Sequence, residues 1–137
     1  MTIRKSGNRY LLTNRSMSYG FELAAPGAVN LYWGAPLADP AELPDARLRR
    51  SYRHCPAQRV EYFCQEYPAF GGHFYGEPAL KAAFADGVRA VFPAFQRDEI
   101  RGNELILFFR DAKHPLEIEL HYVLRDELLE RFEDSPM

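Results

Sequence analysis

Residues 116–124, which read LEIELHYVL, decide the fold. Their large apolar side chains fall on every second position, and the ionisable side chains of Glu117, Glu119 and His121 fall between them. Successive side chains of a strand point to opposite faces of a sheet. The alternation therefore predicts a strand with one buried face and one solvated face, preceded by a loop at residues 111–115.

The same alternation predicts two hairpins. Residues 17–23 and 29–33 alternate on either side of Pro26-Gly27, a pair typical of turns. Alternation over 17–23 also predicts that this strand is buried on one face only. Gly102-Asn103 marks the turn of a second hairpin, with strands expected at 95–101 and 104–110.

Residues 79–92 are compatible with two interpretations. Their alanines suit a helix. Apolar side chains nevertheless alternate at positions 80, 82 and 84, and again at 88, 90 and 92, on either side of Asp86-Gly87. Because Asp-Gly between alternating apolar residues is a strong hairpin signal, we expect a strand, a turn and a second strand here.

Two further regions lack this alternation. Between Gly34 and Arg59, four prolines interrupt every candidate element, and five arginines lie from Arg47 onwards. A loop of this length in a small domain is typically functional or disordered, and we interpret its arginines as a solvated charged surface rather than a site for an anionic ligand. The tail at 126–134 is compatible with one or two helical turns and equally with the start of another strand.

Composition narrows the class of protein. The chain has 137 residues with a net charge of −2, and 14% of them are aromatic. This length fits a single domain over residues 1–137, and short, closely spaced strands predict an all-β antiparallel β-sandwich with, as one option, a short C-terminal helix. The charge argues against nucleic-acid binding, and no apolar run is long enough for a membrane span. Two cysteines and a polar N-terminus without a signal peptide indicate a cytoplasmic protein.

Candidate catalytic and metal-binding residues lack the spacing that their chemistry needs. No Gly-x-Ser-x-Gly elbow accompanies the four histidines of the sequence. The residue types that bind zinc occur at His54, Cys55, Cys64 and His73. The two cysteines are too far apart in the sequence for the compact Cys-x₂₋₄-Cys spacing of a typical zinc site. The sequence also has no glycine-rich phosphate loop. We therefore predict no catalytic residue, no metal site and no cofactor.

Two stretches of the sequence resemble a known family. The first covers residues 12–23 (LTNRSMSYGFEL) and is followed after a turn by residues 29–34 (VNLYWG). The second covers residues 65–72 (QEYPAFGG) and continues through 75–80 (YGEPAL) to 84–89 (FADGVR). Together they resemble the N-terminal domain of family 36 glycoside hydrolases, the bacterial and fungal α-galactosidases, over about residues 10–122.

The resemblance implies a fold and a role. In that family this region is a galactose-mutarotase-like β-supersandwich that precedes a catalytic (β/α)₈ barrel, and the two catalytic aspartates lie in the barrel. The chain is then a non-catalytic module that resembles the first part of the supersandwich. The family's module helps to build oligomers, and the loop after its Tyr-Trp-Gly strand approaches a neighbouring subunit's sugar pocket. By this resemblance, Trp33 and Asp45 are the candidate substrate-proximal residues.

A function of a different class stays open from the residues alone. A free-standing carbohydrate-binding or protein-interaction sandwich would also explain the aromatic content. The expected partners are a second copy of the chain or a glycoside hydrolase barrel, with galactosides as candidate ligands and with no nucleic acid or membrane. Because half of a supersandwich leaves strand edges uncovered, and such edges pair readily with other strands, we expect a dimer or higher oligomer.

Overall fold

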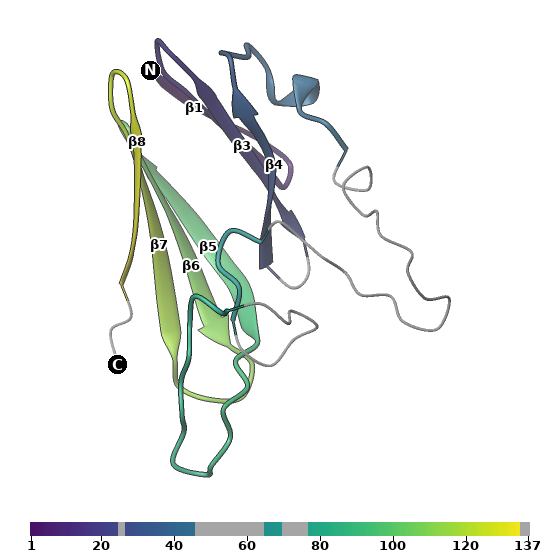
Figure 1. Ribbon diagram of the computed structural model, residues 1–137, viewed down its shortest axis with the longest axis vertical. Coiled ribbons are helices and arrows are strands. Elements are labelled where there is room, and N and C mark those ends of the chain that lie inside the picture. Colours follow the sequence, from purple (N-terminus) through teal and green to yellow (C-terminus); the bar gives the residue numbers. More distant parts are fainter. Residues whose placement is uncertain (25–26, 46–64, 70–76, 135–137) are drawn as a thin grey trace.

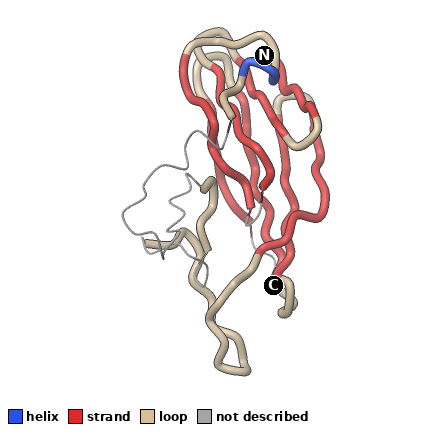
Figure 2. The backbone as a smooth tube through the Cα atoms, turned by 90° about the vertical axis from the view of Figure 1, so that its right-hand side faces the viewer, coloured by secondary structure: helices blue, strands red, loops and turns tan. Residues whose placement is uncertain are grey.

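The computed structural model describes residues 1–24, 27–45, 65–69 and 77–134. These residues form two four-stranded antiparallel sheets, each with its strands in sequence order. The first sheet contains β1 (Thr2–Ser6), β2 (Arg9–Thr13), β3 (Ser18–Ala24) and β4 (Gly27–Gly34), followed by one 3₁₀ turn, η1 (Pro40–Glu42). The second sheet contains β5 (Pro93–Arg101), β6 (Glu104–Asp111), β7 (Glu117–Leu124) and β8 (Leu129–Asp134). The sheets form two layers, and the loop before β5 extends past the ends of the strands (Figure 1, Figure 2).

The main hydrophobic core lies between the two layers. The first sheet contributes Tyr10, Leu12 and Phe21, and the second contributes alternate residues of β6 and β7. Phe21 stacks on Tyr10 from its own sheet and on Tyr122 from the opposite sheet, with 5.0 Å between ring centroids in each pair. Aromatic rings therefore connect the layers at their centre, and the predicted all-β sandwich is confirmed.

A smaller core covers the outer face of the first sheet. Leu11, Leu31 and Leu43 are buried there. Leu43, directly after η1, lies over Gly20, where an added Cβ atom would come within 2.3 Å of the leucine side chain. Ser18 is also fully buried. The expectation of a single buried face for residues 17–23 is therefore wrong, because the segment around η1 covers the face that was expected to meet solvent.

Alternation and turn pairs located five strands correctly. β3, β4, β5, β6 and β7 fall where the sequence predicted strands, with boundaries that differ by no more than two residues. Gly102 adopts a φ of 58° in the β5–β6 turn, a conformation that glycine accepts readily because it has no Cβ atom. Sequence analysis did not predict the β1–β2 hairpin, because β1 is an exposed edge strand with the mostly polar sequence TIRKS.

Residues 79–92 contain the predicted turn but not the predicted strands. The N–H of Gly87 donates to the carbonyl of Phe84 at 2.9 Å, and Gly87 has a φ of 82°. Leu80, Ala82 and Phe84 are partly buried against the main core. Leu80 makes a single bridge to Ala69, and within the described ranges the segment is part of no sheet. Its alternation therefore reflects an extended chain that packs onto the core.

The tail forms a strand, so the alternative of a short C-terminal helix is wrong. β8 pairs with β7 from Leu129 opposite Leu124 to Asp134 opposite Glu119. The N–H of Arg125 donates to the carbonyl of Leu128 at 2.8 Å and closes the hairpin between the two strands. Pairing with β7 satisfies the backbone of the tail at the edge of a sheet that already exists, which outweighs the weak helical pattern.

In the described ranges, no helix is long and apolar enough to cross a membrane. Two groups of candidate residues lie outside the described residues. They are the zinc-ligand types His54, Cys55, Cys64 and His73, and the arginines from Arg47 to Arg59.

Candidate functional site

A buried carboxylate joins the two sheets on the side where β4 and β8 are edge strands. Glu66 is 3% exposed, and its backbone N–H donates to the carbonyl of Ala28 in β4 at 2.8 Å. Its side chain accepts a hydrogen bond from the hydroxyl of Tyr19 in β3 at 2.7 Å. It accepts another from the hydroxyl of Tyr122 in β7 at 3.0 Å. One carboxylate thus binds groups from both layers.

Arg131 in β8 completes this cluster. Its Nη1 lies 3.4 Å from Oε2 of Glu66 and also donates to the backbone carbonyl of Glu66. Burial raises the pKa of Tyr19 and Tyr122, and the adjacent charge of Glu66 raises both pKa values further. The two hydroxyls therefore stay protonated and act as donors at neutral pH. Because a buried charge is tolerated only when it is paired and hydrogen-bonded, the four side chains act as one unit.

A groove of about 340 Å³ opens beside this cluster, between β4 and β8. Tyr19, Tyr122 and Arg131 line it on the side of the core, and Trp33 lines it from β4. Met17, Glu127, Leu128 and Leu129 complete the lining. The indole of Trp33 is 74% exposed. A large aromatic ring beside a guanidinium and a carboxylate can contact an amphipathic ligand or a protein surface.

The structure does not bring the two candidate substrate-proximal residues together. Trp33 pairs with Tyr19 across β3 and β4 and therefore faces the groove on the inner side of the first sheet. Asp45 follows Leu43, which packs on the outer face of that sheet, and Asp45 does not line the groove. Of the two, Trp33 lines the groove beside the buried polar cluster.

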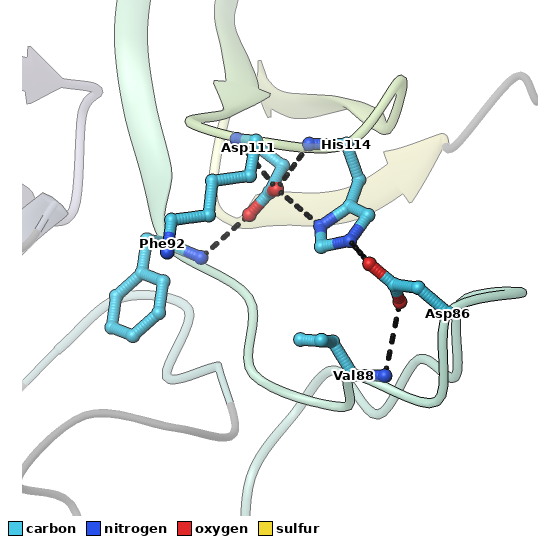
Figure 3. Close-up of polar contacts among 6 residues, drawn as sticks. Asp86, Val88, Phe92, Asp111 and His114 are labelled. Atoms are coloured by element: carbon cyan, nitrogen blue, oxygen red, sulfur yellow. Dashed lines mark hydrogen bonds and ion pairs between the residues drawn. The ribbon is translucent and has the colours of Figure 1, made fainter.

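A second polar cluster lies where the loop before β5 meets the β6–β7 connection (Figure 3). Asp111 is buried and accepts backbone hydrogen bonds from Phe92 (2.7 Å), Lys113 (3.0 Å) and His114 (2.8 Å). The His114 ring lies between two carboxylates: Nδ1 is 3.1 Å from Asp111 Oδ2, and Nε2 is 2.8 Å from Asp86 Oδ2. This cluster holds the loop against the end of the second sheet.

The groups in this second cluster shift one another's pKa values. Burial alone would raise the pKa of Asp111, but the hydrogen bonds from the backbone of Phe92, Lys113 and His114 outweigh it and lower that pKa to about 2. The hydrogen bond to Asp86 raises the pKa of His114, and this effect exceeds the opposing effect of burial. Backbone donors therefore account for the lowered pKa of Asp111, and the contact with Asp86 accounts for the raised pKa of His114.

Metal ligands do not cluster in the part of the chain that the structure describes. There, no group of three or more His, Cys, Asp or Glu side chains is arranged to hold a metal ion. His121 in β7, for example, makes contacts with side chains of its own sheet. It lies between Glu104 (2.8 Å) and Glu119 (3.1 Å) and stacks on Phe132, so its contacts stay within the outer surface of the second sheet.

Sequence analysis missed the role of Glu66. The signal was available in part, because Glu66 lies in the stretch QEYPAFGG, which the resemblance singled out. Its partners Tyr19, Tyr122 and Arg131 are 47, 56 and 65 residues away in the sequence. No local pattern in a single sequence connects positions so far apart.

Comparison with known proteins identifies a family. The model of the glycosyl hydrolase family 36 N-terminal domain matches residues 28–131. The α-galactosidase AgaB from Geobacillus stearothermophilus has a TM-score of 0.77 at 21% identity, covering 98% of this chain and 22% of that chain. The α-galactosidase from Lactobacillus brevis has a TM-score of 0.77 at 16% identity, with the same coverage. The galactosidase domain of AgaSK, an α-galactosidase–sucrose kinase, has a TM-score of 0.74 at 19% identity, covering 96% of this chain and 22% of that chain.

These comparisons show which family the chain belongs to and how much of each solved relative it covers. The chain spans about a fifth of the length of these solved relatives, and the family model that matches describes an N-terminal domain. No curated protein sequence matches the chain. The match of the family model covers most of the chain, and the two-sheet fold with its described strands agrees with the solved relatives. The chain therefore belongs to the family of glycosyl hydrolase family 36 N-terminal domains.

Proposed function

We propose that the chain is a non-catalytic module of an α-galactosidase-like glycoside hydrolase. In this role it assembles with a second copy or with a hydrolase barrel, and it helps to shape a sugar-binding site. The family match and the coverage of about a fifth of each solved relative support a module rather than a whole enzyme. The observation that carries the assembly role is Trp33, a large aromatic side chain left 74% exposed beside the groove.

The physical basis of the proposed assembly is the free energy that exposed apolar side chains cost on this side of the sandwich. Leu128, in the β7–β8 hairpin, is also exposed and lines the same groove as Trp33. Contiguous exposed apolar surface with a polar surround is typical of interaction sites, and tryptophan and arginine are enriched among the residues that dominate binding energy. Trp33 and Arg131 supply both residue types to the same groove. Association would remove the indole from water.

The same groove favours a second candidate function, direct sugar binding by the chain. Trp33 offers a flat apolar surface for the C–H face of a pyranose, and Arg131 and Glu127 offer polar groups for its hydroxyls. An AgaA α-galactosidase variant from Geobacillus stearothermophilus was solved in complex with raffinose; it has a TM-score of 0.69 at 20% identity, covering 93% of this chain and 22% of that chain.

Fluorescence of Trp33 separates the two candidates, because the sequence contains a single tryptophan. We expect the emission of the purified chain to shift to shorter wavelength as its own concentration rises, since association buries the exposed indole. We expect no saturable change on addition of galactose or raffinose. A saturable response to sugar at low protein concentration would favour the second candidate, and an emission that responds to neither would contradict assembly through Trp33. Release of galactose from a chromogenic α-galactoside by the chain would contradict the non-catalytic role.

A further inference from the structure

His114 makes contacts that a neutral imidazole cannot make. Both ring nitrogens lie within hydrogen-bonding distance of carboxylate oxygens, one of Asp111 and one of Asp86. A neutral imidazole has one N–H donor, and its other nitrogen carries a lone pair that would face a carboxylate oxygen unfavourably. Only the doubly protonated ring donates to both carboxylates at once. Between two ionised carboxylates, the geometry in Figure 3 suits an imidazolium.

We propose that Asp86, His114 and Asp111 form a proton-operated latch. In its closed state the imidazolium holds the turn at residues 84–88 against the β6–β7 connection. Loss of one proton releases that turn. The inference rests on the geometry of the three side chains and is independent of the proposed function.

The two carboxylates have different parts in the latch. Asp111 is fixed by three backbone N–H donors, from Phe92, Lys113 and His114, so it remains the partner of Nδ1 in both states. Asp86 lies on the exposed turn, with 55% of its side chain accessible, and its contact across the cluster is the one with Nε2. Deprotonation at Nε2 therefore turns the contact with Asp86 from an ion pair into a repulsion. The turn is the mobile side of the latch.

Packing makes the closed state specific. The ring of Phe84, which begins the turn, stacks on His114 with 3.7 Å between centroids and an angle of 3° between planes. The turn is closed by hydrogen bonds between Phe84 and Val88 and between Gly87 and Phe84, both at 2.9 Å, and the N–H of Val88 donates to Asp86 Oδ1 at 3.0 Å. The turn is thus one small unit that moves with Asp86.

The charged groups around His114 determine the direction of the pH response. Asp86 and Asp111 face the ring directly, and Arg110 and Lys113 line the adjacent hollow of about 470 Å³. The carboxylates dominate because they contact the ring, and the pKa of His114 is raised. A group with a raised pKa in the folded state stabilises that state below its ordinary pKa, and this contribution is lost as pH rises through the raised value. The latch is closed at lower pH and opens as pH increases.

Solution NMR of the ¹⁵N-labelled chain tests the latch. Across a pH titration we expect the amide signals of Gly87 and Val88 to shift with the midpoint of the His114 ring signals, at a pH above the ordinary histidine value of about 6.5. We expect amide hydrogen exchange at Val88 to accelerate once the ring is deprotonated. In Asp86→Asn, which keeps a side-chain oxygen for Val88 but loses the charge, both responses disappear.

A matched variant separates the latch from other titrations. His121 also lies between two carboxylates, Glu104 and Glu119, but it faces the outer surface of the second sheet. His121→Gln is expected to leave the response of Gly87 and Val88 unchanged. The latch is excluded if those two amides do not follow His114, if Asp86→Asn keeps their response, or if His121→Gln abolishes it.

Discussion

Replacing Glu66 by alanine lowers the free energy of unfolding by about 2–4 kcal/mol, because two tyrosine hydroxyls between the sheets lose their acceptor at about 1–3 kcal/mol each. The substitution leaves the hydroxyls of Tyr19 and Tyr122 without their acceptor. It also removes the carboxylate that pairs with Arg131, but that side chain is 38% exposed, so water replaces most of this interaction. Urea-induced unfolding followed by circular dichroism measures the change. Glu66→Gln keeps an acceptor oxygen and loses only the charge, so it costs less, about 1–3 kcal/mol.

The control for this result is a glutamate of the same size in a different environment. Glu77 pairs with Lys81, but its side chain is 81% exposed. Glu77→Ala is expected to change stability by no more than about 0.5 kcal/mol. Equal effects of the Glu66 and Glu77 substitutions would show that the buried cluster does not join the two sheets energetically.

Phe21→Ala is expected to cost about 3–5 kcal/mol, because it opens a cavity at the point where the layers meet. The Phe21 side chain is fully buried and stacks between Tyr10 of its own sheet and Tyr122 of the opposite sheet. Its removal takes away contacts with both layers, and the surrounding rings are too rigid to fill the space completely. The same urea titration measures this loss.

A second phenylalanine provides the comparison for Phe21. Phe92 is 44% exposed, and the hydrogen bond that it makes to Asp111 comes from its backbone N–H. Phe92→Ala removes an exposed ring and leaves that bond in place, so we expect a change below about 1 kcal/mol. If Phe21→Ala were as mild as Phe92→Ala, the stacked rings would not be the centre of the core.

The sequence predicted strands where apolar residues alternate or where a turn pair separates two runs. β7 is the clearest case, because Ile118, Leu120, Tyr122 and Leu124 are buried in alternation with residues that face outward. β1 was missed because an exposed edge strand needs no apolar face. Residues 80–84 show the converse error: they alternate because they pack on the core, yet among the described residues their pairing is limited to the single bridge of Leu80 to Ala69. Alternation shows that an extended chain is buried on one side. It does not show that the chain is hydrogen-bonded to a neighbouring strand, which a sheet also requires.

The candidate site was predicted less completely than the fold. Trp33 was identified through a resemblance, and the structure places it in a groove. Asp45 was chosen on the same basis, but it follows the segment that packs on the opposite face of the first sheet. The cluster around Glu66 depends on three residues from three different strands, and the latch at His114 depends on a turn 28 residues away. Only the folded chain brings these groups together.

Sedimentation velocity over a wide range of concentrations tests the proposed assembly module most directly. We expect the unaltered chain to associate, and Trp33→Ala to weaken that association about 30-fold, as expected for loss of about 2 kcal/mol at a dominant interface residue. Ile100→Ala, which truncates an exposed side chain on β5, serves as the control and leaves association unchanged. A chain that stays monomeric at every concentration, or that associates equally well without the Trp33 indole, would contradict assembly of two copies through Trp33.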